Sequence, residues 1–202
     1  MVFIAENGAL ITGDAILLLA AEHLLEKARL SQATVVTTVM ANMGLEKSLR
    51  ERGVSMVRTP VGDKYVLEEM QRLGAVLGGE QTGHIIFADA ATTGDGLLTA
   101  CRILEIMSAS EKPLSQLASQ LTVFPQTLRN VRVREKPDLQ EIPAIAGAIT
   151  DVEQQLGDCG RVLVRYSGTE PLVRVMVEAE DPDDVERHAS VLVESLQEHL
   201  GV

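Results

Sequence analysis

The sequence predicts an α/β protein in two parts, a layered α/β domain over residues 1–123 and a smaller α+β domain over residues 124–202. In the first part, short runs of apolar and β-branched residues alternate with segments whose apolar residues recur at helical spacing. Such alternation predicts a sheet covered by helices on both faces. In the second part, two strands joined by a five-residue turn and accompanied by two helices predict a small α+β layer.

The first part begins with a predicted hairpin over residues 1–11, because the Asn-Gly pair at 7–8 supplies two residues that tolerate positive φ in a tight turn. The chain is therefore expected to open within the sheet. The sequence TGD at 12–14 then offers capping groups for a helix over 15–30. The further elements expected here are strands at 34–40, 54–58, 76–77 and 84–88, and helices at 45–52, 65–73, 95–109 and 114–120.

The second part begins where the pattern changes, after the Lys-Pro pair at 112–113 and the short helix that follows it. The Phe-Pro pair at 124–125 marks the predicted domain boundary. We expect strands at 127–134, 161–166 and 172–180, and helices at 142–156 and 183–200.

The composition excludes several classes of partner. A formal net charge of -11 repels phosphate backbones and anionic lipid surfaces, so we expect neither a nucleic acid nor a membrane partner. The longest apolar run, 15–21, is far shorter than the roughly 20 residues that span a bilayer. Cys101 and Cys159 form no CxxC pair and no metal-ligand spacing with the histidines, which favours a reducing, cytoplasmic setting.

The segment GGEQTGH at 78–84 is the first candidate for a functional site. Its glycines allow a sharp turn and a close approach of the backbone to a ligand. Glu80, Thr82 and His84 alternate along the chain, so their side chains are expected on one side. A carboxylate, a hydroxyl and an imidazole together suit the hydroxyls of a sugar. The alternative is a Gly-rich connection whose polar residues face water.

The segment RYSGTEP at 165–171 is the second candidate. The Arg165 guanidinium, two hydroxyls and backbone amides around a glycine are the groups that hold a phosphate. Arg174 offers a second cation shortly after the turn. The alternative is a polar turn in which Arg165 pairs with an acid on the acidic surface.

Three other carboxylates are interpreted mainly as helix caps. Asp95, within TTGDG at 92–96, is a single carboxylate and is poor evidence for a metal site, so capping by Thr93 or Asp95 is preferred. Asp14 precedes its helix in the same manner. Asp63 and Lys64 follow a Pro-Val-Gly sequence at the expected mouth of the sheet, where capping and ligand contact both remain open.

The remaining histidines and the common enzyme motifs give no site. His23, His188 and His199 fall on predicted helices without a second ligand at helical spacing, and we expect them to be exposed to solvent. No Ser/His/Asp arrangement, Walker loop or dinucleotide fingerprint is present.

The two candidate segments resemble motifs of one family, the α-D-phosphohexomutases. Segment 78–84 resembles the family's sugar-binding loop, and 165–171 resembles the phosphate-binding loop of its fourth domain. Segments 61–70 and 92–100 are similar to the branch of the family that acts on glucosamine phosphates. The four motifs occur in the family's order along the whole chain.

The resemblance implies the fold in more detail. Residues 1–123 would be the mixed α/β sandwich of domain three, with the tail end of domain two. Residues 124–202 would be the C-terminal domain four, an α+β layer like that of the TATA-box-binding protein. The partners implied are a small-molecule phosphosugar and N-terminal domains one and two.

The resemblance also implies an activity for the full-length protein. This would be an isomerase that interconverts glucosamine 6-phosphate and glucosamine 1-phosphate through a phosphoserine and a bisphosphate intermediate. It would use Mg²⁺ and a glucosamine 1,6-bisphosphate-type activator. Neither the serine loop nor the Asp-x-Asp-x-Asp metal loop is found in this sequence, so no catalytic or metal residue is assigned and this chain alone is expected to be inactive.

The site residues implied by the resemblance fall in both parts. Glu80 and Thr82 would bind ring hydroxyls, and the other implied ligand contacts are His84, Asp63, Lys64, Arg165, Ser167, Gly168, Thr169 and Arg174. Thr82 replaces the usual serine, and Pro60 stands at a variable position. The alternatives left open are a fragment of a phosphomannomutase or phosphoglucomutase, and a stand-alone phosphosugar-binding module.

Overall fold

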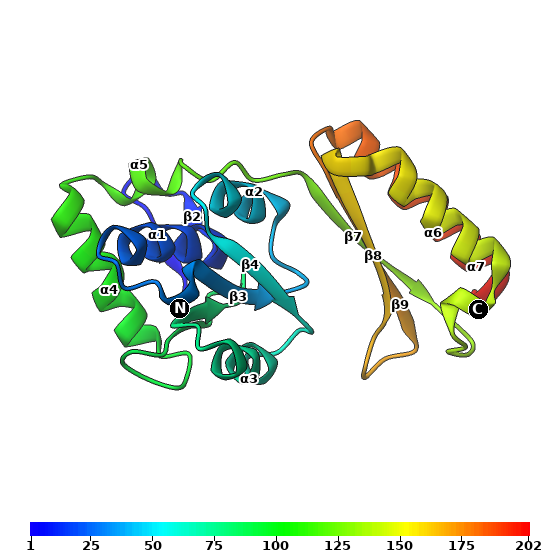
Figure 1. The fold of residues 1–202 in the computed structure, drawn as a ribbon. Helices are drawn as coiled ribbons and strands as arrows, with labels where there is room; N and C mark the ends of the chain where they lie inside the picture. Colours follow the sequence, from blue (N-terminus) through cyan, green and yellow to red (C-terminus); the bar gives the residue numbers. More distant parts are fainter. The chain divides into compact units, whose positions relative to one another are not determined.

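The computed structural model describes residues 1–202 and divides into two compact units, Met1–Val123 and Phe124–Val202 (Figure 1). Each unit has its own apolar core and is described by itself. No helix is both long enough and apolar enough to cross a membrane.

A four-stranded sheet in the order β4-β3-β5-β6 forms the centre of unit 1. Strands β3 (Thr34–Thr38), β4 (Ser55–Thr59) and β5 (Leu77–Gly79) are parallel, and β6 (Ile85–Phe87) is antiparallel to β5. Every residue of β3 is buried, as expected for an inner strand with helices on both faces.

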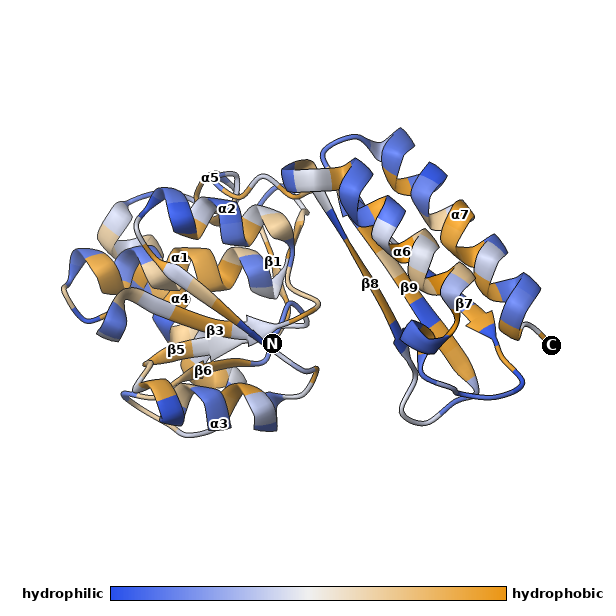
Figure 2. Cartoon of the chain, turned by 45° about the vertical axis from the view of Figure 1, so that its right-hand side comes forward, coloured by the Kyte–Doolittle hydropathy of each residue, from blue (hydrophilic) through white to orange (hydrophobic).

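Helices cover both faces of this sheet, as the alternation predicted. Val35, Leu77 and Phe87 pack toward α1 (Gly13–Glu26), while Val36 and Ile86 pack toward α3 on the opposite face (Figure 1). Figure 2 shows α1 as one of the most apolar helices of the unit, and most of its residues are buried. The helices around them are α2 (Met43–Glu51), α3 (Asp63–Leu73), α4 (Gly96–Ser110) and α5 (Leu114–Ala118).

Close packing of α3 against β5 explains one glycine of the first candidate segment. A Cβ atom on Gly78 would lie 2.5 Å from Met70 Sδ and 2.8 Å from Val36 O. Gly78 and Gly79 are strand residues, so the expectation that they serve the close approach of a ligand is wrong for the strand itself. The small size of Gly78 lets α3 approach the sheet, whereas a Cβ atom on Gly79 would lie 2.5 Å from His84 O in the following turn.

The N-terminal hairpin differs from its prediction in two respects. Strands β1 (Phe3–Ile4) and β2 (Leu10–Ile11) pair only with each other, so the chain does not open within the main sheet. Gly8 has a φ of 83°, but Asn7 does not have positive φ. The Asn7 side chain instead accepts a hydrogen bond from Ala9 N at 3.0 Å, which closes a longer turn.

Unit 2 is a three-stranded antiparallel sheet with two helices on one face. Strands β7 (Gln126–Arg132), β9 (Leu172–Ala179) and β8 (Gly160–Tyr166) lie in that order. Helices α6 (Pro143–Leu156) and α7 (Pro182–Leu200) cover the face on which Val173, Val175 and Val177 are buried. Arg174 lies between these valines in sequence, so its side chain stands on the other face. The elements match those predicted, with small differences at their ends.

Helix α1 ends at Glu26, earlier than the predicted residue 30. Ala28 adopts a φ of 54°, which stops the helix, and a short 3-10 turn at Ser31–Ala33 leads into β3. Strand β3 also ends before residue 40, because Ala41 N turns back to donate to Thr38 O at 3.1 Å.

The prediction that His188 is exposed is wrong. His188 is only 2% exposed, because it lies on the face of α7 that carries Val185 and Leu192 into the core. Burial lowers the pKa of His188, Arg187 lowers it further, and Asp184 partly opposes the shift. His23 and His199 are half-buried rather than exposed: His23 lies 4.0 Å from Glu105, and His199 Nδ1 lies 2.9 Å from Ser195 O.

The buried histidine predicts how unit 2 responds to acid. Because the pKa of His188 is lower in the folded protein than the ordinary 6.5, the unfolded chain binds more protons as the pH falls below about 6.5. The contribution of His188 to the free energy of unfolding is therefore largest above that pH, and it decreases as the pH falls below it. Denaturant melts of His188→Gln at pH 7.5 and 5.5 should show a smaller decrease than the parent protein, whereas His199→Gln should keep it. An equal decrease in His188→Gln and the parent would contradict this reading.

Candidate functional site

The carboxyl ends of β4 and β5 lie at the same edge of the unit 1 sheet, because both strands run parallel to β3. After β4 the chain turns at Gly62 into α3, and after β5 it turns back at residues 80–84 into β6. This is the edge at which open α/β sheets place their ligands. We call residues 80–84 the carboxylate loop.

The carboxylate loop brings its three polar side chains together. Glu80 N donates to His84 O and Gly83 N donates to Glu80 O, both at 2.9 Å, which closes a tight turn that Gly83 completes with a φ of 94°. Thr82 Oγ1 then lies 3.3 Å from Glu80 Oε2 and 3.4 Å from His84 Nδ1, and that nitrogen lies 3.5 Å from Glu80 Oε2. The side chains share one side as predicted, although a turn and not an extended strand places them there.

The two oxygens of the Glu80 carboxylate have different partners. Oε1 accepts a hydrogen bond from Gly62 N at 3.0 Å, while Oε2 faces Thr82 and His84. Gly62 has a φ of 137°, a conformation that a residue with a Cβ rarely adopts. Glu80 therefore connects the carboxylate loop to the turn that starts α3. Local patterns in the sequence could not predict this bond, because its partners are 18 residues apart.

Asp63 and Lys64 come directly after this connection. Both are exposed, and Asp63 Oδ1 accepts a hydrogen bond from Lys64 N at 2.8 Å. Lys64 Nζ lies 3.8 Å from Glu68 Oε1 on the same helix. The structure places the pair beside the carboxylate loop through Gly62, with no direct bond to Glu80, Thr82 or His84.

The start of α1 packs directly against the carboxylate loop. Gly13 N donates to Gln81 O at 2.8 Å, and a Cβ atom on Gly13 would lie only 2.1 Å from Glu80 O. Thr12 caps this helix by accepting from Ala15 N. Asp14 is not a cap of its own helix as predicted, because it is buried and its Oδ2 accepts from Asn42 N at 3.1 Å.

The helix cap predicted at Thr93 or Asp95 is confirmed, and Asp95 is the capping residue. Its Oδ1 accepts from Leu97 N at 2.8 Å and from Leu98 N at 3.0 Å, at the start of α4. Gly94, in the same segment, would place a Cβ 3.5 Å from His84 Cβ, so this segment borders the carboxylate loop. No group of three or more His, Cys, Asp or Glu side chains is placed to hold a metal ion.

In unit 2, the second candidate segment forms the hairpin between β8 and β9. Arg165 and Arg174 are directly opposite each other across the two strands, on the face that the helices do not cover. Like charges in such a pair are destabilising. Burial lowers the pKa of Arg165, and the neighbouring Arg174 charge lowers it further. We call residues 165–171 together with Arg174 the arginine loop.

The arginine loop has donors that no protein group satisfies. The Arg165 side chain has no hydrogen-bond partner, and Arg174 donates to Glu170 Oε2 at 3.3 Å while its buried Nε has none. The exposed backbone amides of Gly168 and Thr169 are also without partners. Two guanidinium groups beside two free amides form a site suited to an anion.

Ser167 occupies a different position from its neighbours. Its residue is 2% exposed, its N donates to Leu172 O at 2.8 Å, and its Oγ accepts from Glu170 N at 3.3 Å. The hydroxyl oxygen thus helps to close the turn. Of the predicted phosphate-binding groups, Ser167 is buried, whereas the Arg165 and Arg174 side chains are partly exposed and Gly168 and Thr169 are exposed.

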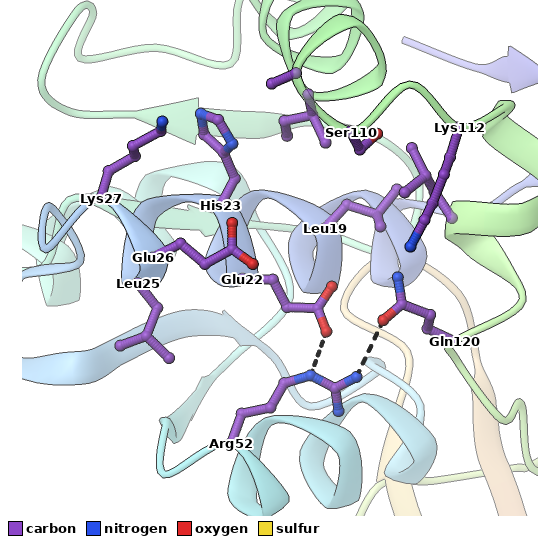
Figure 3. A pocket seen from close by; sticks show the side chains of 13 residues that line it. Leu19, Glu22, His23, Leu25, Glu26, Lys27, Arg52, Ser110, Lys112 and Gln120 are labelled. Carbon is purple, nitrogen blue, oxygen red and sulfur yellow. Dashed lines mark hydrogen bonds and ion pairs between the residues drawn. The ribbon is translucent and has the colours of Figure 1, made fainter.

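Unit 1 also contains a groove of about 410 Å³ that is lined by no residue of the carboxylate loop (Figure 3). It is lined by residues of α1, α4 and α5 with Arg52. Arg52 forms an ion pair with Glu22 and donates to Gln120 Oε1 at 3.4 Å, so the charges of Arg52 and Glu22 offset each other. The groove contains none of the predicted site residues.

Comparison with protein-family models gave two matches. The model described as phosphoglucomutase/phosphomannomutase, alpha/beta/alpha domain III, matches residues 12–124. The model described as phosphoglucomutase/phosphomannomutase, C-terminal domain, matches residues 128–195.

Curated relatives are similar over nearly the whole chain. A phosphoglucosamine mutase of Koribacter versatilis is 53% identical over 197 residues, which are 97% of this chain and 42% of that protein. The corresponding enzyme of Nitratidesulfovibrio vulgaris strain Miyazaki F is 51% identical over 99% of this chain and 44% of its own length. The chain therefore spans less than half the length of these relatives.

Solved structures share the fold. An Aspergillus fumigatus N-acetylphosphoglucosamine mutase, determined in complex with GlcNAc-6P and magnesium, matches 96% of this chain and 49% of its own with a TM-score of 0.79 and 21% identity. A phosphoglucomutase/phosphomannomutase family protein of Burkholderia thailandensis matches all of this chain and 46% of its own, with a TM-score of 0.77 and 24% identity.

The bond between Gly62 and Glu80 can be tested with Gly62→Ala. An alanine at this position would have to adopt a φ of 137°, and its Cβ would lie 3.2 Å from the Tyr65 ring. The turn must therefore shift, which releases Glu80 Oε1 from Gly62 N. We expect a loss of about 1 kcal/mol or more of stability and altered NMR signals for Thr82 and His84.

Gly53→Ala is the matched control, because Gly53 has a φ of 70° but nothing lies near its Cβ position. It should cost similar stability and leave the carboxylate loop unchanged. Unaltered Thr82 and His84 signals in Gly62→Ala would show that the connection does not hold the loop.

Proposed function

We propose, from the premise that this chain belongs to the phosphoglucomutase/phosphomannomutase family, that it is the phosphosugar-binding part of an enzyme interconverting glucosamine 6-phosphate and glucosamine 1-phosphate. The observation that carries the proposal is the arginine loop, with two guanidinium groups and two free amides around one exposed turn. The choice of sugar is supported by relatives named phosphoglucosamine mutase, which are 53% and 51% identical in sequence to this chain.

The arginine loop would bind the phosphate that is not transferred. A phosphate dianion placed between Arg165 and Arg174 relieves the repulsion of two like charges and accepts hydrogen bonds from both. The amides of Gly168 and Thr169 add donors of fixed direction. Ser167 would contribute mainly by closing the turn that presents those amides.

The carboxylate loop would read the sugar. Glu80 Oε2 can accept a hydrogen bond from a ring hydroxyl, while Thr82 and His84 can both donate and accept. Because Oε1 is held by Gly62 N, the direction of the carboxylate is set before the ligand arrives. Asp63 and Lys64, which follow Gly62, would complete the ligand contacts on this side.

The chemical step would depend on groups outside the residues described. We infer a phosphoserine donor and a bisphosphate intermediate, with a glucosamine 1,6-bisphosphate-type activator. Magnesium accompanies the Aspergillus fumigatus enzyme, but no cluster of acidic or histidine side chains in this chain fits a metal ion, so no step is assigned to it here. In our proposal the metal and the serine come from domains one and two.

The domain assignment and the location follow from the same proposal. Unit 1 would correspond to domain three, with residues before the match at 12–124 as the tail end of domain two, and unit 2 to domain four. A cytoplasmic location is supported by Cys101 and Cys159, which are both exposed and unpaired.

Two alternatives keep specific support. The family description names phosphoglucomutase and phosphomannomutase, so glucose or mannose phosphates are possible substrates of the whole enzyme. A stand-alone phosphosugar-binding module is supported by the complete cores of both units. Reading the coding sequence upstream of Met1 for a serine loop and a metal loop separates this module from a part of an enzyme.

The proposed division of labour predicts two kinds of binding defect. Arg165→Ala should weaken binding of glucosamine, glucose and mannose 6-phosphates by a similar factor, about tenfold or more, since all carry the same phosphate. Glu80→Gln should weaken them unequally, because it changes a contact to the ring. NMR titration of this chain measures the three dissociation constants.

Two exposed residues of α7 provide matched controls, Arg187→Ala and Glu194→Gln. Neither should change the constants by more than about twofold. If Glu80→Gln weakened all three sugars by one factor and Arg165→Ala changed their order, the roles of the two loops would be reversed.

The proposal also predicts that this chain alone does not catalyse the mutase reaction. Phosphoryl transfer requires a phosphorylated donor and the metal that neutralises developing charge. Incubation with glucosamine 6-phosphate, Mg²⁺ and a hexose bisphosphate should give no glucosamine 1-phosphate. Turnover that scales with protein concentration and survives repurification would contradict this expectation.

A further inference from the structure

The segment that follows β7 is bonded to the arginine loop by two hydrogen bonds. Lys136 Nζ donates to Ser167 O at 2.7 Å, and the Tyr166 hydroxyl donates to Pro137 O at 2.7 Å. The bonds run in opposite directions between two pairs of adjacent residues that are about 30 positions apart in sequence. Sequence reasoning singled out neither partner in the 136–137 segment.

The bond from Lys136 sets the direction of one of the free amides. Ser167 O and the Gly168 N–H belong to the same peptide unit, which is planar and trans. In such a unit the carbonyl and the N–H point in opposite directions. With the carbonyl held toward Lys136, the Gly168 N–H must point away from Lys136.

Little else holds this peptide unit in place. The Lys136 bond is the only hydrogen bond to Ser167 O, and the Gly168 amide has no partner. Ser167 itself is buried and its N is bonded to Leu172 O, but the space around Gly168 is open, since no atom lies within 4 Å of the position of a Gly168 Cβ. A glycine tolerates both orientations of the peptide. Rotation of this unit would replace an N–H donor with a carbonyl oxygen, which repels an anion.

The second bond keeps the 136–137 segment in position. Burial raises the pKa of Tyr166, and the nearby Asp138 and Glu135 carboxylates raise it further, so the phenol remains a donor. Asp138 Oδ1 accepts from Gln140 N at 3.0 Å and caps the short 3-10 helix Leu139–Glu141. The segment that carries the lysine is therefore anchored directly after it, at Pro137 and Asp138.

We propose that Lys136 is a positioning residue for anion binding: it holds the Ser167–Gly168 peptide so that the Gly168 N–H faces the anion. This inference rests on the proposed phosphate-binding role of the arginine loop. It assigns Lys136 a role through Ser167 O and not through contact with the ligand.

The test compares Lys136→Met with the parent chain, using inorganic phosphate as the probe. Phosphate should bind about tenfold more weakly to Lys136→Met. The ratio should persist between 50 and 500 mM NaCl, because a loss that came only from a missing distant charge would be screened by salt. Lys136→Arg, which keeps a charged donor, should recover most of the binding. Tyr166→Phe, which removes the other bond without changing charge, should weaken binding by a smaller factor.

Arg134→Met is the matched control for charge. Arg134 lies on the same segment and donates to His199 O at 2.7 Å, with no bond to the arginine loop. The Arg134→Met variant should bind phosphate with a dissociation constant within about twofold of that of the parent chain. Unchanged amide signals of Val175 and Ala189 in each variant confirm that unit 2 remains folded.

A second measurement does not need a ligand. Residual dipolar couplings of the Gly168 N–H report its orientation in the free chain and should change in Lys136→Met but not in Arg134→Met. If the parent binds no phosphate but the Gly168 N–H orientation changes in Lys136→Met, the proposed phosphate-binding function fails. The positioning of this amide by Lys136 then still stands. If the orientation is unchanged, or if Lys136→Met binds phosphate as well as the parent, the positioning role is wrong.

Discussion

An unfavourable pairing of charge explains the arrangement of unit 2. Antiparallel pairing of β8 and β9 places Arg165 opposite Arg174, and burial adds to the cost of holding both charges. Only Arg174 has a carboxylate partner, from Glu170. The surrounding turn adds two exposed amides that are bonded to no protein group. An anion between the two guanidinium groups would offset their repulsion and accept hydrogen bonds from the free donors, which supports the proposed phosphate-binding role of the hairpin.

In unit 1 the charged group is an anion, and it is bonded within the protein. The partly buried Glu80 carboxylate is held in a fixed direction. The Gly62 amide binds one oxygen of Glu80, and the tight turn supplies Thr82 and His84 to the other. Glycines make this possible by close packing: Gly13 lets α1 meet the turn, and Gly78 lets α3 approach β5. In both loops, then, residues that do not contact a ligand set the direction of those proposed to do so.

Local patterns predicted much of this structure, because the features concerned are local. Helical and strand periodicity located the elements, the Gly-rich spacing indicated a turn with Glu80, Thr82 and His84 on one side, and Asp95 was identified as a cap. Patterns failed where a distant part of the chain decides. Asp14 bonds to Asn42, and His188 is buried by packing. The bonds from Gly62 to Glu80 and from Lys136 to Ser167 join segments far apart in sequence.

The most direct test of the account is a crystal structure of this chain with glucosamine 6-phosphate. The account predicts the phosphate within hydrogen-bond distance of the Arg165 guanidinium and of the Gly168 and Thr169 amides, with Ser167 O still bonded to Lys136. A phosphate bound elsewhere, such as the groove beside Arg52, with the arginine loop empty, would contradict it.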